Sequence, residues 1–279
     1  MTKFIKISTL IVGFSIISNF SLGKSFSLIE FDSLSYELVK NYTLRSEILI
    51  PHSAYTVGYN ADWKIPNWVA YVLTGTHLNS QQCSRNDCFK TDPQLSKLKV
   101  VANSRISNAD YNKSGYDRGH MAPAADMRWD TNIMIESFFM TNICPQAPSL
   151  NRIYWENLEE TTRFWAKKYD SIYVVCGPII SNPTNCFSKK NIVIPAAFFK
   201  ALLRHDKSGW HAIAFILDNF NEIQHFSEHA ISIDNLELLT GLDFFYNLPD
   251  EIENKVEASF SLNDWPYTDD NIEEILPAE

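Results

Sequence analysis

The amphipathic stretch from Leu150 to Lys168 is the feature that most constrains the fold. Its apolar side chains recur at helical spacing, at Ile153, Tyr154, Leu158, Phe164 and Trp165. Ser149 or Asn151 is a suitable N-cap. Strand-length apolar runs lie on both sides of this helix, at residues 54–59, 68–73, 171–176 and 210–217, and a second helix is expected at 233–239. Isolated helices among strands predict an α+β fold, with helices packed on a mixed or antiparallel central sheet.

Composition and charge exclude some classes of protein and leave nucleic-acid binding open. Of the 279 residues 45% are hydrophobic, which is enough for a packed core and argues against wholesale disorder. The net charge of −9 at first argues against a nucleic-acid partner. However, residues 218–279 carry a net −15 and residues 1–217 a net +6, so most of the chain can still present a basic face.

The first 23 residues have the pattern of a secretory signal peptide. Lys3 and Lys6 precede a short apolar run, Leu10–Ile17, and the small residues Ser21 and Gly23 suit the −3 and −1 positions of a cleavage site. An N-terminal core helix and an uncleaved anchor are the alternatives. The pattern predicts a secreted or periplasmic protein with no stable membrane span after cleavage.

Export leads to a prediction about the cysteines, because disulfide bonds persist in oxidising compartments. The spacing favours two local pairs, Cys83–Cys88 and Cys176–Cys186, with Cys144 left over. Sequence does not fix the connectivity. The absence of a Cys-x-x-Cys pair argues against a cysteine-rich zinc site.

The sequence Asp-Arg-Gly-His at 117–120 is the most unusual motif in the chain. An arginine two residues before a histidine, with glycine between them, is expected to hold a cation beside an imidazole on a tight turn. Asn142, Asn151 and Glu159 follow at spacings of nine and eight residues. Eight residues on a helix turn about 80° beyond two full turns, so Asn151 and Glu159 share roughly one side.

This combination resembles the DNA/RNA non-specific endonucleases, the ββα-metal nucleases that include secreted bacterial nucleases and mitochondrial endonuclease G. The resemblance covers about residues 50–250, which leaves residues 24–49 as an N-terminal extension and 251–279 as an acidic tail. The residues that carry it are Asp117–His120, Thr141-Asn142, Pro145-Gln146, Leu150-Asn151 and Trp155–Glu159.

The resemblance implies a ββα-metal active-site motif with one metal ion. His120 would be the general base, since a neutral imidazole can take a proton from water at physiological pH. Asn151 would be the direct metal ligand and Glu159 would hold metal-bound waters. A single neutral ligand suits Mg²⁺ that keeps most of its waters, and Mn²⁺ is a potential substitute.

The same resemblance assigns the remaining site residues. Arg118 would neutralise phosphate charge. The upstream Arg85 is the candidate for a second arginine, and Asn142 is a polar partner near the site. The resemblance thus implies a metal-dependent endonuclease that hydrolyses DNA and RNA with little sequence preference. It also implies products with 5′-phosphate and 3′-hydroxyl ends.

Simpler interpretations of the same residues stay open at this point. His120 could cap a turn, Asn151 could be only a helix N-cap, Asn142 could be a structural amide, and Arg118 could belong to a surface ion pair. The whole chain could be a phosphodiesterase for small nucleotides, or a catalytically silent module that binds nucleic acid or a host protein. A homodimer is compatible with either function.

Overall fold

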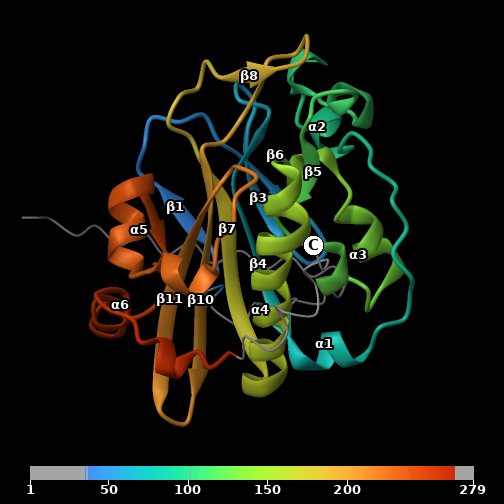
Figure 1. Cartoon of the computed structure of the whole chain (residues 1–279). Coiled ribbons are helices and arrows are strands. Elements are labelled where there is room, and N and C mark those ends of the chain that lie inside the picture. Colours follow the sequence, from blue (N-terminus) through green and yellow to red (C-terminus); the bar gives the residue numbers. More distant parts are fainter. Residues whose placement is uncertain (1–34, 36, 101, 268–279) are drawn as a thin grey trace, which may run out of the picture. The chain divides into compact units, whose positions relative to one another are not determined.

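A seven-stranded antiparallel sheet forms the centre of the fold (Figure 1). The structure is a computed structural model, and it describes residues 35–267 except 36 and 101. In spatial order the strands are β12 (Ala230–Ile231), β11 (Gly209–Asp218), β10 (Ala197–Asp206), β7 (Ser171–Ile179), β4 (Ile65–Thr74), β3 (Thr56–Asn60) and β2 (Ile48–Pro51). Strands β3, β4, β7 and β11 cover the four predicted apolar runs.

The central strands are apolar on both sides because the sheet is covered on both faces. In β10, Phe198 and Leu202 belong to one hydrophobic cluster. Their neighbours Phe199, Ala201 and Leu203 belong to the other. Side chains alternate between the faces of a strand, so these two clusters are two separate layers of core.

Helix α4 (Trp155–Tyr169) covers the first of these faces, and its start is irregular. A five-residue π-helical segment, Leu150–Tyr154, leads into it, so together they cover the predicted helix. The helix buries Leu158, Thr162 and Trp165 at spacings of three and four residues, which is the pattern of an amphipathic helix. Neither predicted N-cap makes a cap: Ser149 has no side-chain cap bond, and Asn151 lies inside the π-helical segment.

A two-stranded ribbon lies on the same face as α4. Strand β5 (Asp117–His120) pairs antiparallel with β6 (Ile143–Gln146). Ile143 and Cys144 are fully buried in the same cluster as the buried side of α4. The two strands and α4 form the ββα unit, so the predicted α+β class with this motif is confirmed. Short helices surround the unit, namely α1 (Gly75–Asn79), α2 (Gln94–Lys97) and α3 (Thr131–Glu136).

The opposite face is covered by two helices near the C-terminal end, α5 (Ile233–Thr240) and α6 (Asp250–Glu257). Ile233, Leu236 and Val256 pack in the second cluster. Helix α5 is followed by Gly241 as its C-cap, whose φ of 68° is left-handed and suits glycine. Short strand pairs complete the fold, β1 (Val39–Asn41) with β13 (Leu242–Phe244) and β8 (Cys186–Phe187) with β9 (Ile192–Val193).

The predicted domain limits of 50 and 250 are too narrow. Strands β1 and β2, from the predicted extension at 24–49, pair with β13 and β3. Helix α6 packs on the second face, and Trp265 is fully buried. Pairing and burial therefore place β1, β2, α6 and Trp265 inside the folded unit. The predicted signal peptide at 1–23 and the last twelve residues of the acidic tail lie outside the described residues.

The predicted disulfide bonds are absent, and all five cysteines are free. Cys176 lies in the central strand β7, where its buried thiol is 2.9 Å from the carbonyl oxygen of Met121. Cys186 belongs to a separate two-stranded sheet. Within residues 35–267, apart from the two that are not described, no helix has the length and apolar character to cross a membrane.

Candidate active site

Strand β5 carries the Asp-Arg-Gly-His motif, so the predicted tight turn is wrong. Because the strand is extended, Arg118 and His120, two residues apart, point to the same side. Gly119 points to the other side, where a Cβ atom would lie 1.8 Å from Oε1 of Gln146. Any larger residue there would have to displace the buried side chain of Gln146, so glycine suits this position.

His120 is buried in a partly aromatic environment. It is 8% exposed, and its ring centroid lies 5.3 Å from that of Phe89 and 4.9 Å from that of Phe138. Burial, with a smaller contribution from the Arg85 cation, lowers the pKa of His120 to about 3, although Asp87 acts in the opposite direction. The ring is therefore neutral at physiological pH and can accept a proton.

The two ring nitrogens of His120 differ in access. Nε2 is sealed from solvent and has no hydrogen-bond partner among the described residues. Nδ1 is not sealed in this way, and His120 lines the pocket described below. Nδ1 is thus the nitrogen that a water molecule can reach. The ring makes no hydrogen bond to a turn, which excludes the turn-capping interpretation within the described part of the chain.

Asn142 lies beneath the pocket, and its predicted place among the catalytic residues needs correction. It is fully buried. Its Nδ2 donates to the carbonyl oxygens of Ala122 and Ser137, both at 2.8 Å, and its Oδ1 accepts from the amide of Ala122 at 2.8 Å. The backbone uses these donors and acceptors, so Asn142 holds the segment after His120 and does not face the pocket.

Asn151 comes from the π-helical segment that precedes α4. π-Helical turns inside helices are frequent at functional sites. Its Nδ2 donates to Oδ2 of Asp117 at 3.0 Å, which fixes the orientation of the amide and leaves Oδ1 as its free acceptor. Because the side chain does not accept a bond from the helix, the N-cap interpretation of Asn151 is wrong.

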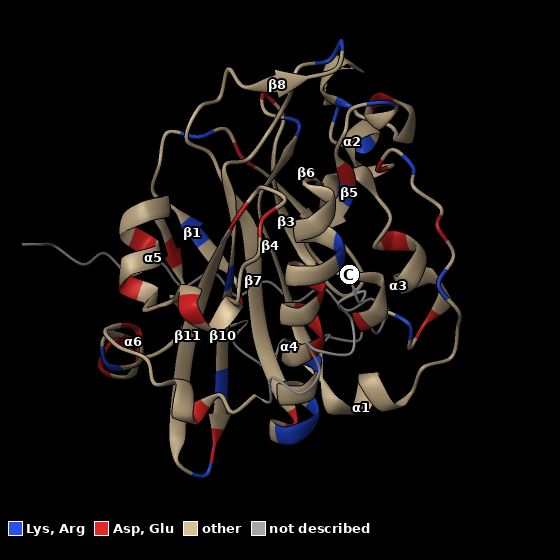
Figure 2. Cartoon of the chain, viewed as in Figure 1, with Lys and Arg blue, Asp and Glu red and all other residues tan. Residues whose placement is uncertain are grey.

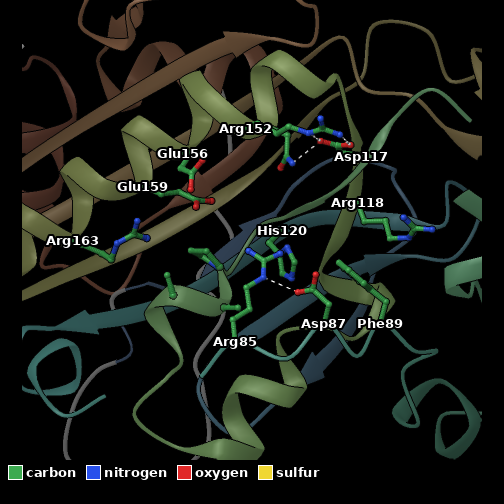
Figure 3. A pocket seen from close by; sticks show the side chains of 14 residues that line it. Arg85, Asp87, Phe89, Asp117, Arg118, His120, Arg152, Glu156, Glu159 and Arg163 are labelled. Atoms are coloured by element: carbon green, nitrogen blue, oxygen red, sulfur yellow. Dashed lines mark hydrogen bonds and ion pairs between the residues drawn. The ribbon is translucent and has the colours of Figure 1, made fainter. Parts of the chain in front are cut away.

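Asp117 is itself held in place by Arg152, which follows Asn151 in the chain. The Arg152 guanidinium donates two hydrogen bonds of 2.7 Å to the two carboxylate oxygens of Asp117 (Figure 3). Burial alone would raise the pKa of Asp117, but the hydrogen bonds from Arg152 and Asn151 hold it below its usual value. Asp117 is therefore ionised and orients Asn151.

Glu159 lies two turns further along the helix and is partly buried. Burial raises the pKa of Glu159 to about 7, while Lys200 and Arg163 act in the opposite direction. Lys200 is fully buried, with Nζ 4.7 Å from the ring centroid of Trp155. Among the described residues, none donates a hydrogen bond to the Glu159 carboxylate, so both of its oxygens are available.

Four arginines surround the pocket in different states of pairing. Arg85 pairs with Asp87 at 2.7 Å, and Arg163 pairs with Asp126 at 3.0 Å. Arg118 donates to Oδ1 of Asn112 and to a backbone carbonyl, but it has no carboxylate partner within the described residues. Its surface ion-pair interpretation is therefore wrong, and its charge is available to an anion.

These side chains line one pocket of about 400 Å³ between β5 and α4 (Figure 3). Five of the six predicted site residues contribute to it, and Asn142 does not. The lining residues are Arg85, Asp87, Phe89, Asp117, Arg118, His120, Pro123, Ala124, Ala125, Asn151, Arg152, Glu156, Glu159 and Arg163.

The donor set of the pocket fits a hard divalent cation. Asn151 offers an amide oxygen with a fixed orientation, and Glu159 offers a carboxylate with no hydrogen-bond donor. Oxygen ligands with room for several waters are what Mg²⁺ prefers. Of the four carboxylates that line the pocket, Asp87 and Asp117 are paired with arginines. This leaves Glu156 and Glu159, which favours one cation and not two.

Nine of the fourteen residues that line the pocket were not predicted, and three of these carry a readable signal. Arg152 and Glu156 flank the predicted residues on the same helix, and Arg163 follows Glu159 by four residues, which places it on the same face. Asp117 belongs to the motif itself, but its link to Asn151 spans 34 positions and becomes visible only in the fold.

Comparison with known proteins agrees with this geometry. The sequence model of the DNA/RNA non-specific endonuclease family matches residues 38–251. A protein named "Nuclease" from Nostoc sp. is 32% identical over 75% of this chain and 77% of its own length. Human mitochondrial endonuclease G is 29% identical over 70% of this chain and 68% of its own length.

A solved structure supports the same assignment. The structure described as an EndoG/EndoGI complex superposes with a TM-score of 0.63 at 26% identity, and the match covers 73% of this chain and 88% of that one. The family match spans most of the chain and includes both strands and the helix that build the pocket. The chain therefore belongs to the DNA/RNA non-specific endonuclease family and is a metal-dependent endonuclease.

Proposed function

We propose that this protein is an exported, Mg²⁺-dependent endonuclease that hydrolyses the phosphodiester bonds of DNA and RNA with little sequence preference. The observation that carries the proposal is the convergence of His120, Asn151 and Glu159 on one pocket with Arg118. These side chains are separated by up to 41 positions in the chain, from 118 to 159. A proton acceptor, oxygen ligands and a free cation are what cleavage of a phosphodiester by water requires.

His120 acts as the general base in this proposal. Its ring is neutral, and Nδ1 takes a proton from a water molecule in the pocket while Nε2 keeps its own proton in the buried side of the site. The surrounding rings of Phe89 and Phe138 restrict the imidazole to this orientation. A positioned base of this kind contributes about 10²–10⁴-fold to the rate.

Arginine charge and the metal ion supply the remaining stabilisation. Arg118 binds a non-bridging phosphate oxygen, and Arg85 and Arg163 add further positive charge to the pocket. Asn151 would hold Mg²⁺ through Oδ1, with Glu159 binding its waters. When bound, the ion supplies Lewis-acid charge for the phosphate and for the leaving oxygen.

Weak sequence preference follows from what the pocket offers a substrate. Its four arginines suit phosphate groups, which are the same in every sequence. Binding that depends on phosphate contacts weakens steeply with added salt. We therefore expect DNA and RNA of any sequence to be cut, and we expect cleavage to slow as the salt concentration rises.

A single assay tests the proposed function. Supercoiled plasmid, single-stranded RNA and a small chromogenic phosphodiester are each incubated with the protein in Mg²⁺, and again with a chelator. Cleavage of both polymers in Mg²⁺ and its loss with chelator are expected, with the small diester cut far more slowly. Cleavage of the small diester alone would identify a phosphodiesterase for small nucleotides and contradict the proposal.

The pH dependence of the Mg²⁺ requirement is a second expected result. Glu159, with its pKa raised to about 7, holds a proton below that pH and loses it above. The apparent Mg²⁺ affinity in the plasmid assay should therefore rise roughly tenfold per pH unit up to about pH 7 and level off above it.

The Glu159→Gln variant is the control for this pH dependence. Its apparent Mg²⁺ affinity should be weaker and nearly independent of pH between about 5 and 8. His120 stays neutral over this range because its pKa is about 3, so it adds no slope. An unchanged slope in the variant would show that another group titrates.

Export is the part of the proposal that rests on the N-terminal sequence alone. Lys3 and Lys6, the apolar run after them and the small residues at 21 and 23 support it. Several relatives are named as mitochondrial nucleases, so export is argued from the N-terminal sequence and not from the family. Mass spectrometry of the protein in periplasmic, medium and cytoplasmic fractions tests export. A mass without the signal peptide is expected in the periplasm or medium, and a full-length mass in the cytoplasm would contradict export.

A further inference from the structure

Three carboxylates come together on the face of the sheet opposite to the active site. Asp234 and Glu237 lie on α5, three residues apart and thus on the same side of the helix. Glu257 is the last residue of α6. One carboxylate oxygen from each residue lies within 4.8 Å of those of the other two. We call this group the α5–α6 trio.

Glu257 distinguishes the trio from an ordinary acidic surface. Its side chain is 5% exposed, and its Oε1 is buried without a hydrogen-bond partner among the described residues. A buried carboxylate oxygen without a donor costs about 1–3 kcal/mol or more. Its carboxylate nevertheless points toward Asp234 and Glu237, where it meets only further negative charge.

The surroundings increase this cost. A negative charge at the C-terminal end of a helix is unfavourable, and Glu257 occupies that position in α6. The carboxylates of Glu237 and Glu253 oppose a negative charge on Glu257. Figure 2 shows acidic residues on both α5 and α6. Lys40 is a cation near the trio. Its charge favours the ionised carboxylates of Asp243 and Glu253.

We propose that the α5–α6 trio is a Ca²⁺ site that joins the two helices. Three carboxylates and waters are typical oxygen ligands for Ca²⁺. The three oxygens lie within 4.8 Å of one another, so a single ion can reach all of them. Three carboxylates on one ion favour Ca²⁺, because Mg²⁺ is usually bound through one or two carboxylates and keeps several waters.

The remaining contacts leave ligand atoms and space for the ion. Glu237 accepts the amide hydrogen of Phe244 through Oε1 at 2.8 Å, which fixes the carboxylate and leaves Oε2 for the metal. A cavity of about 580 Å³, lined in part by Asp234 and Glu237, opens beside the trio and gives access to water. The site is independent of the proposed function, because it shares no residue with the pocket at β5 and α4.

Thermal unfolding of the full-length protein with Ca²⁺ or with chelator tests the proposal. At free Ca²⁺ of 100 times the dissociation constant, the unfolding temperature should rise by about 5–10 °C. Glu257→Gln should lose most of this rise. Its stability without metal should equal or exceed that of the wild type, because an uncharged amide replaces a crowded acid.

Matched variants make the result decisive. Glu251→Gln changes an exposed acid on the same helix and should keep the full Ca²⁺ effect. Asp234→Asn changes the exposed member of the trio and should lose it even if Glu257→Gln fails to fold. Calorimetric titration should show one Ca²⁺ site fewer in Glu257→Gln and in Asp234→Asn than in the wild type. A wild type without a Ca²⁺ effect, or an undiminished effect in Asp234→Asn, would overturn the proposal.

Discussion

Replacing His120 with alanine is expected to reduce cleavage of plasmid and of RNA by about 10²–10⁴-fold, the contribution of a positioned general base. Folding should be largely unaffected, because the ring makes no hydrogen bond within the described residues and its Nε2 is already without a partner. Substrate binding should also persist, since the arginines of the pocket remain. Single-turnover cleavage and a separate binding measurement in chelator check the two parts.

His225→Ala is the matched control for this variant. Its side chain is exposed and lies outside the pocket, so cleavage should stay at the wild-type level. Nicking of plasmid by His120→Ala at the wild-type rate would remove His120 from the mechanism. Loss of binding together with cleavage would instead give the residue a role in holding the substrate.

Replacing Asn142 with alanine is expected to have the largest effect on stability. The change leaves the carbonyl oxygens of Ala122 and Ser137 and one backbone amide buried without partners. At about 1–3 kcal/mol for each of the three groups, the free energy of unfolding should fall by roughly 3–9 kcal/mol. Urea unfolding measures this loss directly, at low temperature if the variant is marginal.

Measurements of activity should show whether Asn142 positions the His120 segment or takes part directly in the reaction. A displaced His120 segment lowers the rate by about 10²-fold even where the variant is folded, because misplacement by about 1 Å has that effect. The apparent Mg²⁺ affinity should stay near that of the wild type, since Asn142 does not line the pocket. Asn132→Ala, an exposed amide on α3, should change neither property. Weakened Mg²⁺ affinity in folded Asn142→Ala would contradict a positioning role.

The spacing of polar residues predicted much of the site because it depends on local geometry. Asn151 and Glu159 lie on one continuous helical segment, so their shared side follows from the period of the helix. Arg118 and His120 lie on one strand, and their separation of two residues puts them on one face whatever the rest of the chain does. Residue type and short-range periodicity are sufficient for such pairs.

Long-range contacts limited the prediction in specific places. Asn142 resembles a ligand in the sequence, since asparagine can serve equally as a metal ligand or as a clamp for backbone groups. Its three backbone contacts, two of them 20 residues away, decide between these roles. The predicted disulfide bonds are wrong for a similar reason. Cys176 and Cys186 are close in the chain but belong to different sheets.

The amino-acid sequence alone determined the class of the fold, the family resemblance and five of the residues that line the pocket, because helix and strand periods act over a few neighbouring residues. Only the tertiary structure decided which groups are buried and which are paired. The structure placed β1 and α6 inside the folded unit. It showed that Asp117 orients Asn151. It also placed Glu257 beside Glu237 of α5, which lies twenty positions earlier in the chain. Burial and charge pairing depend on segments remote in the chain, so no local pattern encodes them.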